Sequence, residues 1–262
     1  MQIKGVSHLH SKYSHDGEIS LAELKEYFKE KGFQFLLLTE HLHDVSEQKI
    51  RQIIDDCRLL SDREFIIIPG LELKDNNKHF LIIGIDGSQN NIEELIKKSP
   101  PNKIVIWAHP FFTGAPREEE IKEYPIDGLE IWNSVYDGKT FPRWQALKLL
   151  EKLRQRKNLY GFCGIDFHRF SHAGGPYLSL ELQNFSQDDI LKNLKTGNYS
   201  MERGNLVVGP DGNLAGGQKT KVKLMSPLIC WMLGLVRFVS WLAYVLKISP
   251  PKKIKESIRS KL

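Results

Sequence analysis

Short apolar segments that end next to a histidine or an acidic residue recur along this chain, and they restrict its fold more than any other feature. Five of them, such as Phe-Leu-Leu-Leu-Thr before Glu40-His41 and Ile-Val-Ile-Trp-Ala before His109, have the length and composition of buried β-strands. Segments with helical periodicity alternate with these strands, which predicts a parallel α/β fold, and about seven such units predict a barrel. In a parallel barrel the C-terminal ends of the strands form one rim, so we expect these polar side chains to meet there.

The expected elements follow the chain in order. Strands are predicted at residues 3–7, 35–39, 65–68, 80–85, 104–108, 128–132 and 160–165. Helices are predicted between Ser20 and Gly32, where Ser20 and Glu23 form a capping-box pattern, and at 46–60, 92–98 and 141–156. The pattern then changes to a strand at 177–182, a helix at 188–196 and a hairpin at 206–214. We therefore expect one globular domain at residues 1–217 and a separate tail at 218–262.

Charge is divided unevenly between these two parts. The whole chain has a net charge of +5, but residues 218–262 contain ten Lys or Arg and one acid, a net of +9. Residues 1–217 are therefore at −4 and lack the basic pattern of a protein that binds long nucleic acid. The cysteines Cys57, Cys163 and Cys230 are far apart, which argues against a disulfide framework and against a cysteine zinc site. Because the first residues lack the apolar stretch of a signal peptide, we expect a cytoplasmic location.

The histidines and carboxylates indicate a metal site with several ions. His8 and His10 are two residues apart on a strand, so their side chains share one face and can bind the same ion. Histidine is the commonest metal ligand in proteins. Asp16-Gly17 has the composition of a turn that would direct the Asp16 side chain inward. His79 departs from the general pattern, because it precedes its strand instead of following it.

The motifs that carry these residues resemble the polymerase and histidinol phosphatase (PHP) family of metal-dependent phosphoesterases. They are, in the family's order and spacing, HLHSKYSHDG (8–17), TEH (39–41), GLE (70–72), His79, AHP (108–110) and GIDFH (164–168). The resemblance covers residues 1 to about 205. It implies a distorted (β/α)7 barrel with up to three metal ions in the cleft.

The resemblance also implies a set of metal ligands, position by position. One ion would be bound by His8, His10, Glu72 and Asp166, a second by Glu72, His79 and His109, and a third by Asp16, His41 and His168. Of these, Glu72, Asp166 and His109 are the residues on which we expect catalysis to depend most. The chain departs from the family pattern at Val6, where Asp is usual two residues before the His pair, at Glu40, where Asp is usual, and at Ile165, where a small polar residue is usual.

This ligand set predicts hydrolytic chemistry. Mixed nitrogen and oxygen ligation suits Zn, Mn or Fe, and we expect three such divalent ions. A metal-activated hydroxide would then hydrolyse the phosphate ester of a small molecule or nucleotide. Arg169 and His172 follow the last motif and are candidates to contact the substrate phosphate. Two alternatives stay open: an amidohydrolase-like metal hydrolase, disfavoured because no lysine stands at a ligand position, and a non-catalytic scaffold that keeps its metals for structure.

The tail has a different pattern. Residues 224–248 are mostly apolar, and their few polar residues, among them Ser226 and Arg237, recur every three or four positions and form one stripe on a helix. A helix this apolar must be buried in protein or membrane. Arg237 at its centre and the basic end at 252–261 disfavour a spanning helix and favour residues 224–262 lying on an anionic membrane surface. We therefore expect the protein at the inner face of the membrane, with docking of this helix on the barrel or on a partner as the alternative.

Overall fold

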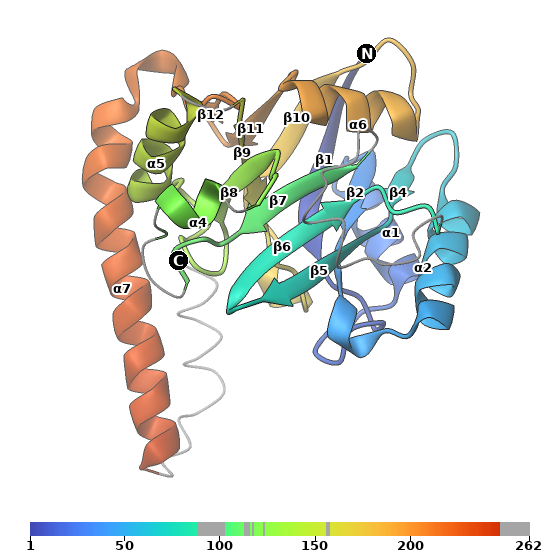
Figure 1. The fold of residues 1–262 in the computed structure, drawn as a ribbon, viewed down its shortest axis with the longest axis horizontal. Helices are drawn as coiled ribbons and strands as arrows, with labels where there is room; N and C mark the ends of the chain where they lie inside the picture. Colours follow the sequence, from blue (N-terminus) through green and yellow to red (C-terminus); the bar gives the residue numbers. More distant parts are fainter. Residues whose placement is uncertain (88–102, 113–115, 117, 123, 156–157, 247–262) are drawn as a thin grey trace.

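The computed structural model describes residues 1–87, 103–112, 116, 118–122, 124–155 and 158–246. The strands lie at the centre of the body, with α1 and α2 on one side and α5 on the other (Figure 1). The helix α7 lies beyond α5 and extends past the body. The helix expected at 92–98 and the basic end at 252–261 lie outside the described residues.

The first of two six-stranded sheets contains the N-terminal strand. Its order is β12-β11-β10-β1-β2-β4. The strand β1 (Gln2–Leu9) is parallel to β2 (Phe35–Leu38), which is parallel to β4 (Ile66–Ile68). The remaining neighbours are antiparallel, and they are β10 (Tyr177–Glu181), β11 (Tyr199–Arg203) and β12 (Leu206–Val208). All residues of β2 and β4 are buried, as is usual for parallel strands covered on both faces.

The second sheet has the order β3-β5-β6-β7-β8-β9. Its parallel strands are β3 (Glu40–His41), β5 (Gly70–Asp75), β7 (Ile104–Ala108), β8 (Gly128–Asn133) and β9 (Tyr160–Gly164). The strand β6 (Lys78–Ile83) is antiparallel to both β5 and β7. A two-residue turn at Asn76-Asn77 causes this reversal, because both residues have positive φ (47° and 64°), a conformation that asparagine tolerates well.

The direction of β6 corrects the expectation of an all-parallel sheet and explains the position of His79. Because β6 runs against its neighbours, its first residues lie beside the last residues of β7. His79 is accordingly paired with Ala108 on one side and with Lys74 on the other. A histidine that precedes its strand therefore reaches the same rim as the side chains that follow theirs.

Hydrogen bonds connect the two sheets. The backbone N–H of Phe167, just after β9, donates to the carbonyl of His8 at 3.0 Å, and the N–H of His10 donates to the carbonyl of Phe167 at 2.8 Å. At the opposite seam, single residues separate β2 from β3 (Thr39) and β4 from β5 (Pro69). The described strands thus form a mixed α/β body of two joined sheets instead of seven regular parallel β/α units.

Most of the predicted helices are present, with small shifts at their ends. Among the described residues, the longer helices of the body are α1 (Leu21–Glu30), α2 (Glu47–Leu60), α5 (Trp144–Arg154) and α6 (Gln187–Thr196). Shorter helical segments are η1 (Leu42–Asp44), α4 (Glu118–Lys122), η2 (Phe170–His172) and η3 (Ala215–Gly217). The capping box at the start of α1 is confirmed, since the Ser20 hydroxyl accepts from the Glu23 N–H and the Glu23 carboxylate accepts from the Ser20 N–H. The hairpin expected at 206–214 is present but short: Val208 and Leu214 form an antiparallel bridge and the Gly209 N–H donates to the Asn213 carbonyl at 2.8 Å, while β12 pairs along its length with β11.

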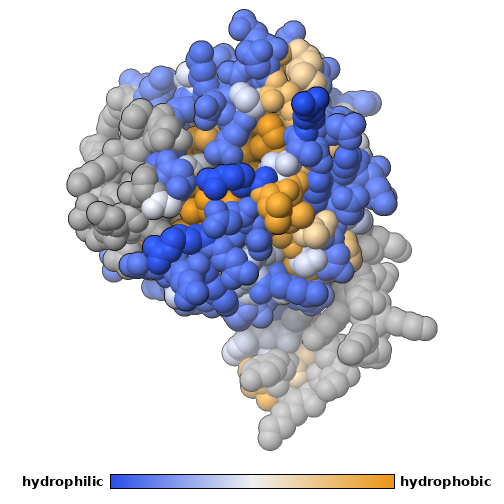
Figure 2. Space-filling view, turned by 90° about the vertical axis from the view of Figure 1, so that its right-hand side faces the viewer, coloured by the Kyte–Doolittle hydropathy of each residue, from blue (hydrophilic) through white to orange (hydrophobic). Residues whose placement is uncertain are grey.

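The helix α7 (Lys219–Val245) contacts the body on one side only. Val222 and Ser226 near its start are buried, and the Ser226 hydroxyl accepts a hydrogen bond of 2.9 Å from the N–H of Trp144. Of the sixteen large hydrophobic side chains that are exposed among the described residues, twelve lie between Leu224 and Leu246. The face of the body in Figure 2, by contrast, is mostly hydrophilic. By length and composition alone, α7 could cross a membrane, and 17% of its most apolar stretch is buried.

Candidate metal centre

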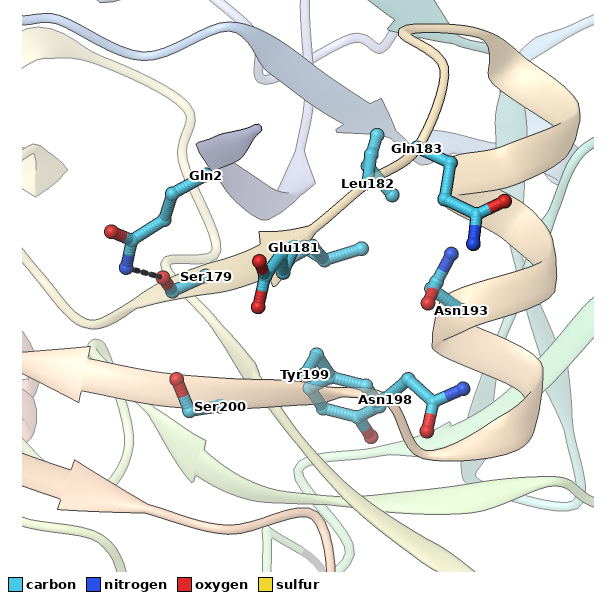
Figure 3. A pocket seen from close by; sticks show the side chains of 10 residues that line it. Gln2, Ser179, Glu181, Leu182, Gln183, Asn193, Asn198, Tyr199 and Ser200 are labelled. Atoms are coloured by element: carbon cyan, nitrogen blue, oxygen red, sulfur yellow. Dashed lines mark hydrogen bonds between the residues drawn. The ribbon is translucent and has the colours of Figure 1, made fainter.

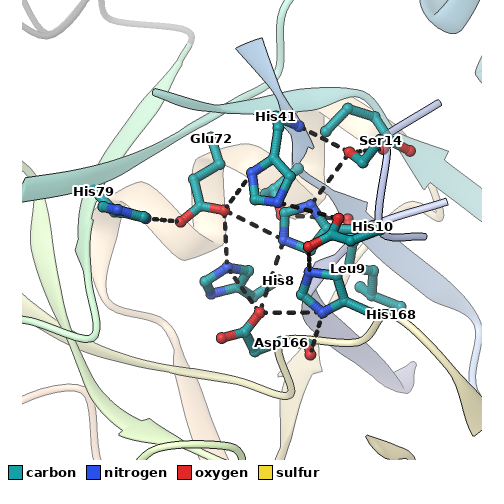
Figure 4. Close-up of polar contacts among 12 residues, drawn as sticks. His8, Leu9, His10, Ser14, His41, Glu72, His79, Asp166 and His168 are labelled. Atoms are coloured by element: carbon teal, nitrogen blue, oxygen red, sulfur yellow. Dashed lines mark hydrogen bonds and ion pairs between the residues drawn. The ribbon is translucent and has the colours of Figure 1, made fainter. Parts of the chain in front are cut away.

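The rim of the body gathers all nine residues that the sequence suggested as metal ligands, and Figure 4 labels seven of them. They come from the end of β1 and the loop after it, from β3, β5 and β6, and from the segments after β7 and β9. In chain order they are His8, His10, Asp16, His41, Glu72, His79, His109, Asp166 and His168. Strands far apart in sequence therefore converge on one cluster of six imidazoles and three carboxylates.

Glu72 lies at the centre of this cluster. Its oxygen Oε1 is 2.6 Å from Nδ1 of His79 and 3.3 Å from Nε2 of His109. Its oxygen Oε2 faces three further imidazole nitrogens, those of His41 at 3.1 Å, His10 at 3.3 Å and His8 at 3.6 Å. A single buried carboxylate thus joins two groups of histidines, which is the arrangement expected of a bridging ligand.

The other two carboxylates lie on either side of His168. Oδ1 of Asp166 is 3.6 Å from Nδ1 of His168, 3.7 Å from Nε2 of His8 and 3.8 Å from Nε2 of His10. Asp16 is 3.1 Å from Nε2 of His168 and 3.4 Å from Nε2 of His41. Nitrogen-to-oxygen gaps of this size leave space for a cation between donor atoms that do not bond to one another directly.

Three sets of possible ligand atoms lie within 4.8 Å of one another in this cluster. They are His8, Glu72 and His109; His8, His10 and Asp166; and His10, His41 and His168. The buried Nε2 atoms of His8 and His10 have no hydrogen-bond partner among the described residues. A buried polar atom without a partner costs about 1–3 kcal/mol, and a divalent ion would relieve this cost. Imidazole and carboxylate donors together suit Zn, Mn or Fe, so the residues present fit such ions.

The electrostatics of the cluster favour cations. Burial alone would raise the pKa of Glu72, but hydrogen bonds from His109 and His41 hold it well below its usual value. Burial would also raise the pKa of Asp166, and the charges of His8 and His109 lower it instead. Both carboxylates are therefore ionised at neutral pH, and they place fixed negative charge at the bottom of the site.

A residue that the sequence did not identify as part of the site, Glu130 on β8, orients two of the histidines. It is 1% exposed, its Oε1 is 2.9 Å from Nδ1 of His8, and its Oε2 accepts the backbone N–H of His109 at 2.8 Å. A carboxylate on Nδ1 fixes the ring and leaves Nε2 free to bind a metal. Gly164 makes room for it, because a Cβ there would lie 1.9 Å from Glu130 Oε1. A sequence signal for Glu130 is its position as an acidic residue inside an apolar strand.

Glu40 has a similar supporting role behind the other histidines. Its carboxylate accepts hydrogen bonds from the N–H of Ser11 at 2.9 Å and from the hydroxyl of Ser14 at 2.5 Å. The Ser14 hydroxyl in turn accepts the backbone N–H of His41 at 2.9 Å and lies 3.5 Å from Nδ1 of His10. Burial raises the pKa of Glu40, although these hydrogen bonds oppose the shift. The buried Glu40 therefore fixes the loop after β1, which carries the predicted ligands His10 and Asp16.

The backbone at the cluster is strained at three of the predicted ligands. His8, Asp166 and His109 have positive φ values of 63°, 49° and 28°. Residues other than glycine pay of order 1–3 kcal/mol for such conformations, which persist mainly where the surroundings enforce them. This strain marks positions where the chain gives up stability to aim a particular side chain.

The two residues suggested as phosphate contacts have different surroundings. Nδ1 of His172 lies 3.3 Å from the backbone nitrogen of His168, and burial lowers the pKa of His172 to about 4. It is therefore neutral at pH 7 and supports the backbone that carries His168. Arg169 is half-exposed at the rim, where it lies 3.5 Å from Glu18. Of these two residues, Arg169 alone presents a permanent positive charge near the cluster.

Trp107 and Trp132, at the ends of β7 and β8, lie in the core. Trp132 is fully buried and donates from Nε1 to the carbonyl of Gly138, while Trp107 packs on Phe80. The wall beside the cluster is instead Tyr136, whose ring centre is 4.7 Å from that of His109. The guanidinium of Arg237, from α7, lies 4.9 Å from the same tyrosine ring. The tail helix thus reaches the edge of the metal cluster, so it contacts the body as in the docking alternative that the sequence left open.

A cavity of about 770 Å³ lies elsewhere, between β10, β11 and α6 (Figure 3). Its walls include Glu181, Asn193, Tyr199 and Ser200, and none of the nine clustered residues lines it. It contains no group of histidines and carboxylates that could hold a metal ion among the described residues. Chemistry is therefore expected at the rim and not in this larger space.

No model of a known protein family matches the chain, and no curated protein matches its sequence. Solved structures do share its fold. A two-domain protein from Bacteroides vulgatus that contains a predicted PHP-like metal-dependent phosphoesterase is 18% identical, with a TM-score of 0.60 over 80% of this chain and 67% of that chain. PsfC from Pseudomonas syringae is 16% identical, with a TM-score of 0.55 over 88% of this chain and 99% of that chain.

A third similar structure is the lesion-specific endonuclease PfuEndoQ from Pyrococcus furiosus. It is 17% identical, with a TM-score of 0.51 over 80% of this chain, which spans 59% of that protein. The expected resemblance is thus confirmed at the level of the fold, which is similar to that of PHP-like metal-dependent phosphoesterases.

Proposed function

We propose that this chain is a metal-dependent phosphoesterase that hydrolyses the phosphate ester of a small molecule or nucleotide. The observation that carries the proposal is the pair of buried, unpartnered Nε2 atoms of His8 and His10, which face the ionised carboxylates of Glu72 and Asp166. A cluster arranged only for packing would have satisfied these nitrogens with hydrogen bonds. The shared fold with PHP-like phosphoesterases supports the same conclusion.

We propose three divalent ions, Zn, Mn or Fe, held as the family resemblance implies. The first would be held by His8, His10, Glu72 and Asp166, the second by Glu72, His79 and His109, and the third by Asp16, His41 and His168. When bound, such ions lower the pKa of a coordinated water towards neutrality and stabilise the charge that develops on the phosphoryl group. The distorted (β/α)7 barrel implied by the family resemblance is also part of this proposal. The two joined sheets would form its wall.

The chain's own residues would prepare the site in three ways. Glu72 and Asp166 supply fixed negative charge for the cations, and their low pKa values keep that charge at neutral pH. Glu130 holds the His8 ring so that Nε2 faces the centre. Arg169 at the rim would attract the substrate phosphate and neutralise part of its charge.

The alternatives from the sequence have less support. An amidohydrolase-like site usually includes a carbamylated lysine, and the nine clustered residues are all histidines and carboxylates. A non-catalytic scaffold would not need strained backbone at His8, His109 and Asp166. Long nucleic acid is not expected as the substrate, because residues 1–217 have a net charge of −4.

The test is Mn-dependent hydrolysis of p-nitrophenyl phosphate by the full chain, with His8→Ala and His43→Ala compared. Loss of a ligand should lower kcat/KM about a thousandfold, the kinetic equivalent of about 4 kcal/mol. His43 is exposed and outside the nine residues, so its variant should keep activity. Equal activity of both variants would contradict the proposal. No turnover by folded, metal-bound protein would instead favour diesters, C–N bonds or the scaffold.

We further propose that α7 and the basic segment after it bind an anionic membrane surface at the cytoplasmic face. The supporting observation is that the polar stripe faces the body, through Ser226 and Arg237, while the apolar face is exposed. A contiguous exposed apolar surface, here with twelve large hydrophobic side chains between Leu224 and Leu246, marks an interaction site. The lysines and arginines of residues 218–262 supply attraction to anionic lipids.

A further inference from the structure

A cavity of about 310 Å³ lies between α7 and the rim of the body. Four of its lining residues come from α7, and they are Leu233, Val236, Arg237 and Ser240. The others follow β8 and β9, and they are Ser134, Val135, Lys139, Arg169, Ser171 and His172. None of the nine clustered residues lines it, so it is a separate compartment beside the metal centre.

The cavity and the metal centre share walls. On one side, His172 lines the cavity while its Nδ1 lies 3.3 Å from the backbone nitrogen of His168. On the other side, Arg237 donates a hydrogen bond of 2.8 Å to the carbonyl of Val135 and covers the Tyr136 ring, which packs on His109. A group held in the cavity would therefore lie next to a phosphate at the metal centre.

The lining chemistry favours an anion with an apolar portion. Three of the ten lining residues are cations (Lys139, Arg169 and Arg237), and no carboxylate is among the ten. The amine of Lys139 donates to the backbone carbonyls of Ser171 and Ala173, so these contacts leave its charge in place. The hydroxyl of Ser134 is buried and has no hydrogen-bond partner among the described residues. An oxygen-rich ligand would satisfy these groups.

One part of the cavity wall is apolar, formed by Val135, Leu233 and Val236. It continues along α7 into the exposed apolar face of that helix. A volume of about 310 Å³ is at the lower end of the range for small-molecule sites. It suits a phosphate with a short stretch of hydrocarbon, and it is too small for a strand of nucleic acid.

We propose that this cavity binds the leaving-group side of an amphiphilic phosphate ester, in which the phosphate is attached to a hydrocarbon chain. This inference rests on the proposed phosphoesterase function and names its substrate class. The phosphate would lie between the metal centre and Arg169, and the chain would run along Leu233 and Val236 towards the exposed face of α7. The tail helix then completes the substrate site as well as joining the body.

The first experiment compares ethyl phosphate with octyl phosphate below its micellar concentration, using the full chain with Mn²⁺. The value of kcat/KM for the octyl ester should be at least about tenfold higher, the gain from burying about two methylene groups. Equal values for the two esters would overturn the inference while leaving the phosphoesterase function intact. No hydrolysis of either ester would overturn the proposed function, and the inference with it.

Two matched variants of α7 test the location. Val236→Asp places a negative charge in the cavity wall and should abolish the octyl preference, while Val239→Asp, at a position that is 55% exposed and outside the cavity, should retain it. Val236→Thr, which is isosteric and less disruptive, should reduce the preference and covers the case in which Val236→Asp does not fold. An octyl preference that is the same in Val236→Thr and Val239→Asp would overturn the assignment.

A third arm separates the two sources of such an ester. The full chain is given phosphatidic acid in vesicles and octyl phosphate free in solution. Turnover of both supports the inference with a membrane lipid as the source, and turnover of octyl phosphate alone supports it with a soluble ester as the source. If ethyl phosphate is hydrolysed with the same kcat/KM as octyl phosphate and phosphatidic acid, the inference is overturned.

Discussion

The candidate metal centre and the helix α7 differ in the kind of side chain that lacks a partner and in where it points. At the rim, polar groups are buried and face one another: Glu72 is 3% exposed and contacts five imidazoles. On α7, apolar groups are exposed and face outward, with Trp231 65% exposed and Phe238 56% exposed. Without a partner, each arrangement costs free energy. At the rim the cost comes from buried polar atoms that lack hydrogen bonds, and on α7 it comes from apolar surface exposed to water.

The two regions therefore fit different kinds of partner. Buried donor atoms around ionised carboxylates require cations, which are small and enter between side chains that are already fixed. An exposed apolar face flanked by basic residues suits a large apolar surface with negative charge, and this is why we propose a membrane as its partner. One chain thus carries two incomplete surfaces, and Arg237 connects them, since it lies on α7 and contacts Tyr136 beside the cluster.

Among the tests of this comparison, the outward face of α7 should give the greatest change. Trp231→Ser together with Phe238→Ser should weaken binding to anionic vesicles by about a hundredfold or more, because full burial of each aromatic side chain contributes about 1.5–3 kcal/mol. Binding is measured by co-sedimentation of the full chain with vesicles that contain phosphatidylserine. Leu59→Ser is the matched control, since Leu59 is 81% exposed on α2. Unchanged binding by the double variant would rule out this face as the membrane contact.

A smaller effect is expected at the rim, from the carboxylate behind the histidines. Glu130→Gln keeps the size of the side chain but removes the charge that orients His8, so metal affinity should fall about 10–100-fold. Competition with a chromophoric chelator measures this affinity for Mn²⁺ and Zn²⁺. Glu181→Gln, an exposed position on β10, is the control. If both variants bind metal as tightly as the unmodified chain, Glu130 has no part in orienting the ligands.

The rim could be predicted from the sequence because its ligands stand at the ends of strands. His8-His10, Glu40-His41, His109 and Asp166 each follow an apolar run, and parallel strands bring such positions together. Glu130 could not be found in this way, because it lies inside β8 and its partners come from β1 and β7. Its function depends on contacts with residues 122 and 21 positions away, His8 and His109, which local spacing does not encode.

The fold was predictable where local signals were strong. The capping box at Ser20 and the strand at 104–108 are present as expected. The antiparallel direction of β6 was missed, because the turn at Asn76-Asn77 was not recognised and only its positive φ values reveal it. β11 (Tyr199–Arg203) was missed because its alternation of apolar and polar residues is short and begins only two residues after Gly197. The docking position of α7 could not be predicted from the sequence, because a helix with one polar stripe can pack on a protein or lie on a membrane.

The smallest expected effect is at Ser226, where the two regions meet. Arg143 is the residue just before α5, and its side chain makes no capping hydrogen bond. The Ser226 hydroxyl of α7 caps the helix instead, because it accepts a hydrogen bond from the N–H of Trp144. Ser226→Ala should therefore lower the free energy of unfolding by about 1–2 kcal/mol, because it leaves a helix N-terminal donor without a partner. Urea unfolding measures the change.

Thr220→Ala, at an exposed position in the first turn of α7, is the matched control and should change stability by less than about 0.5 kcal/mol. A loss at Ser226 alone would mean that α7 is part of the folded body and contributes to its stability before any membrane is present. An equal, small change in both variants would mean that α7 is held only weakly. The membrane would then have to supply the contact that keeps Arg237 and Val236 beside the metal centre.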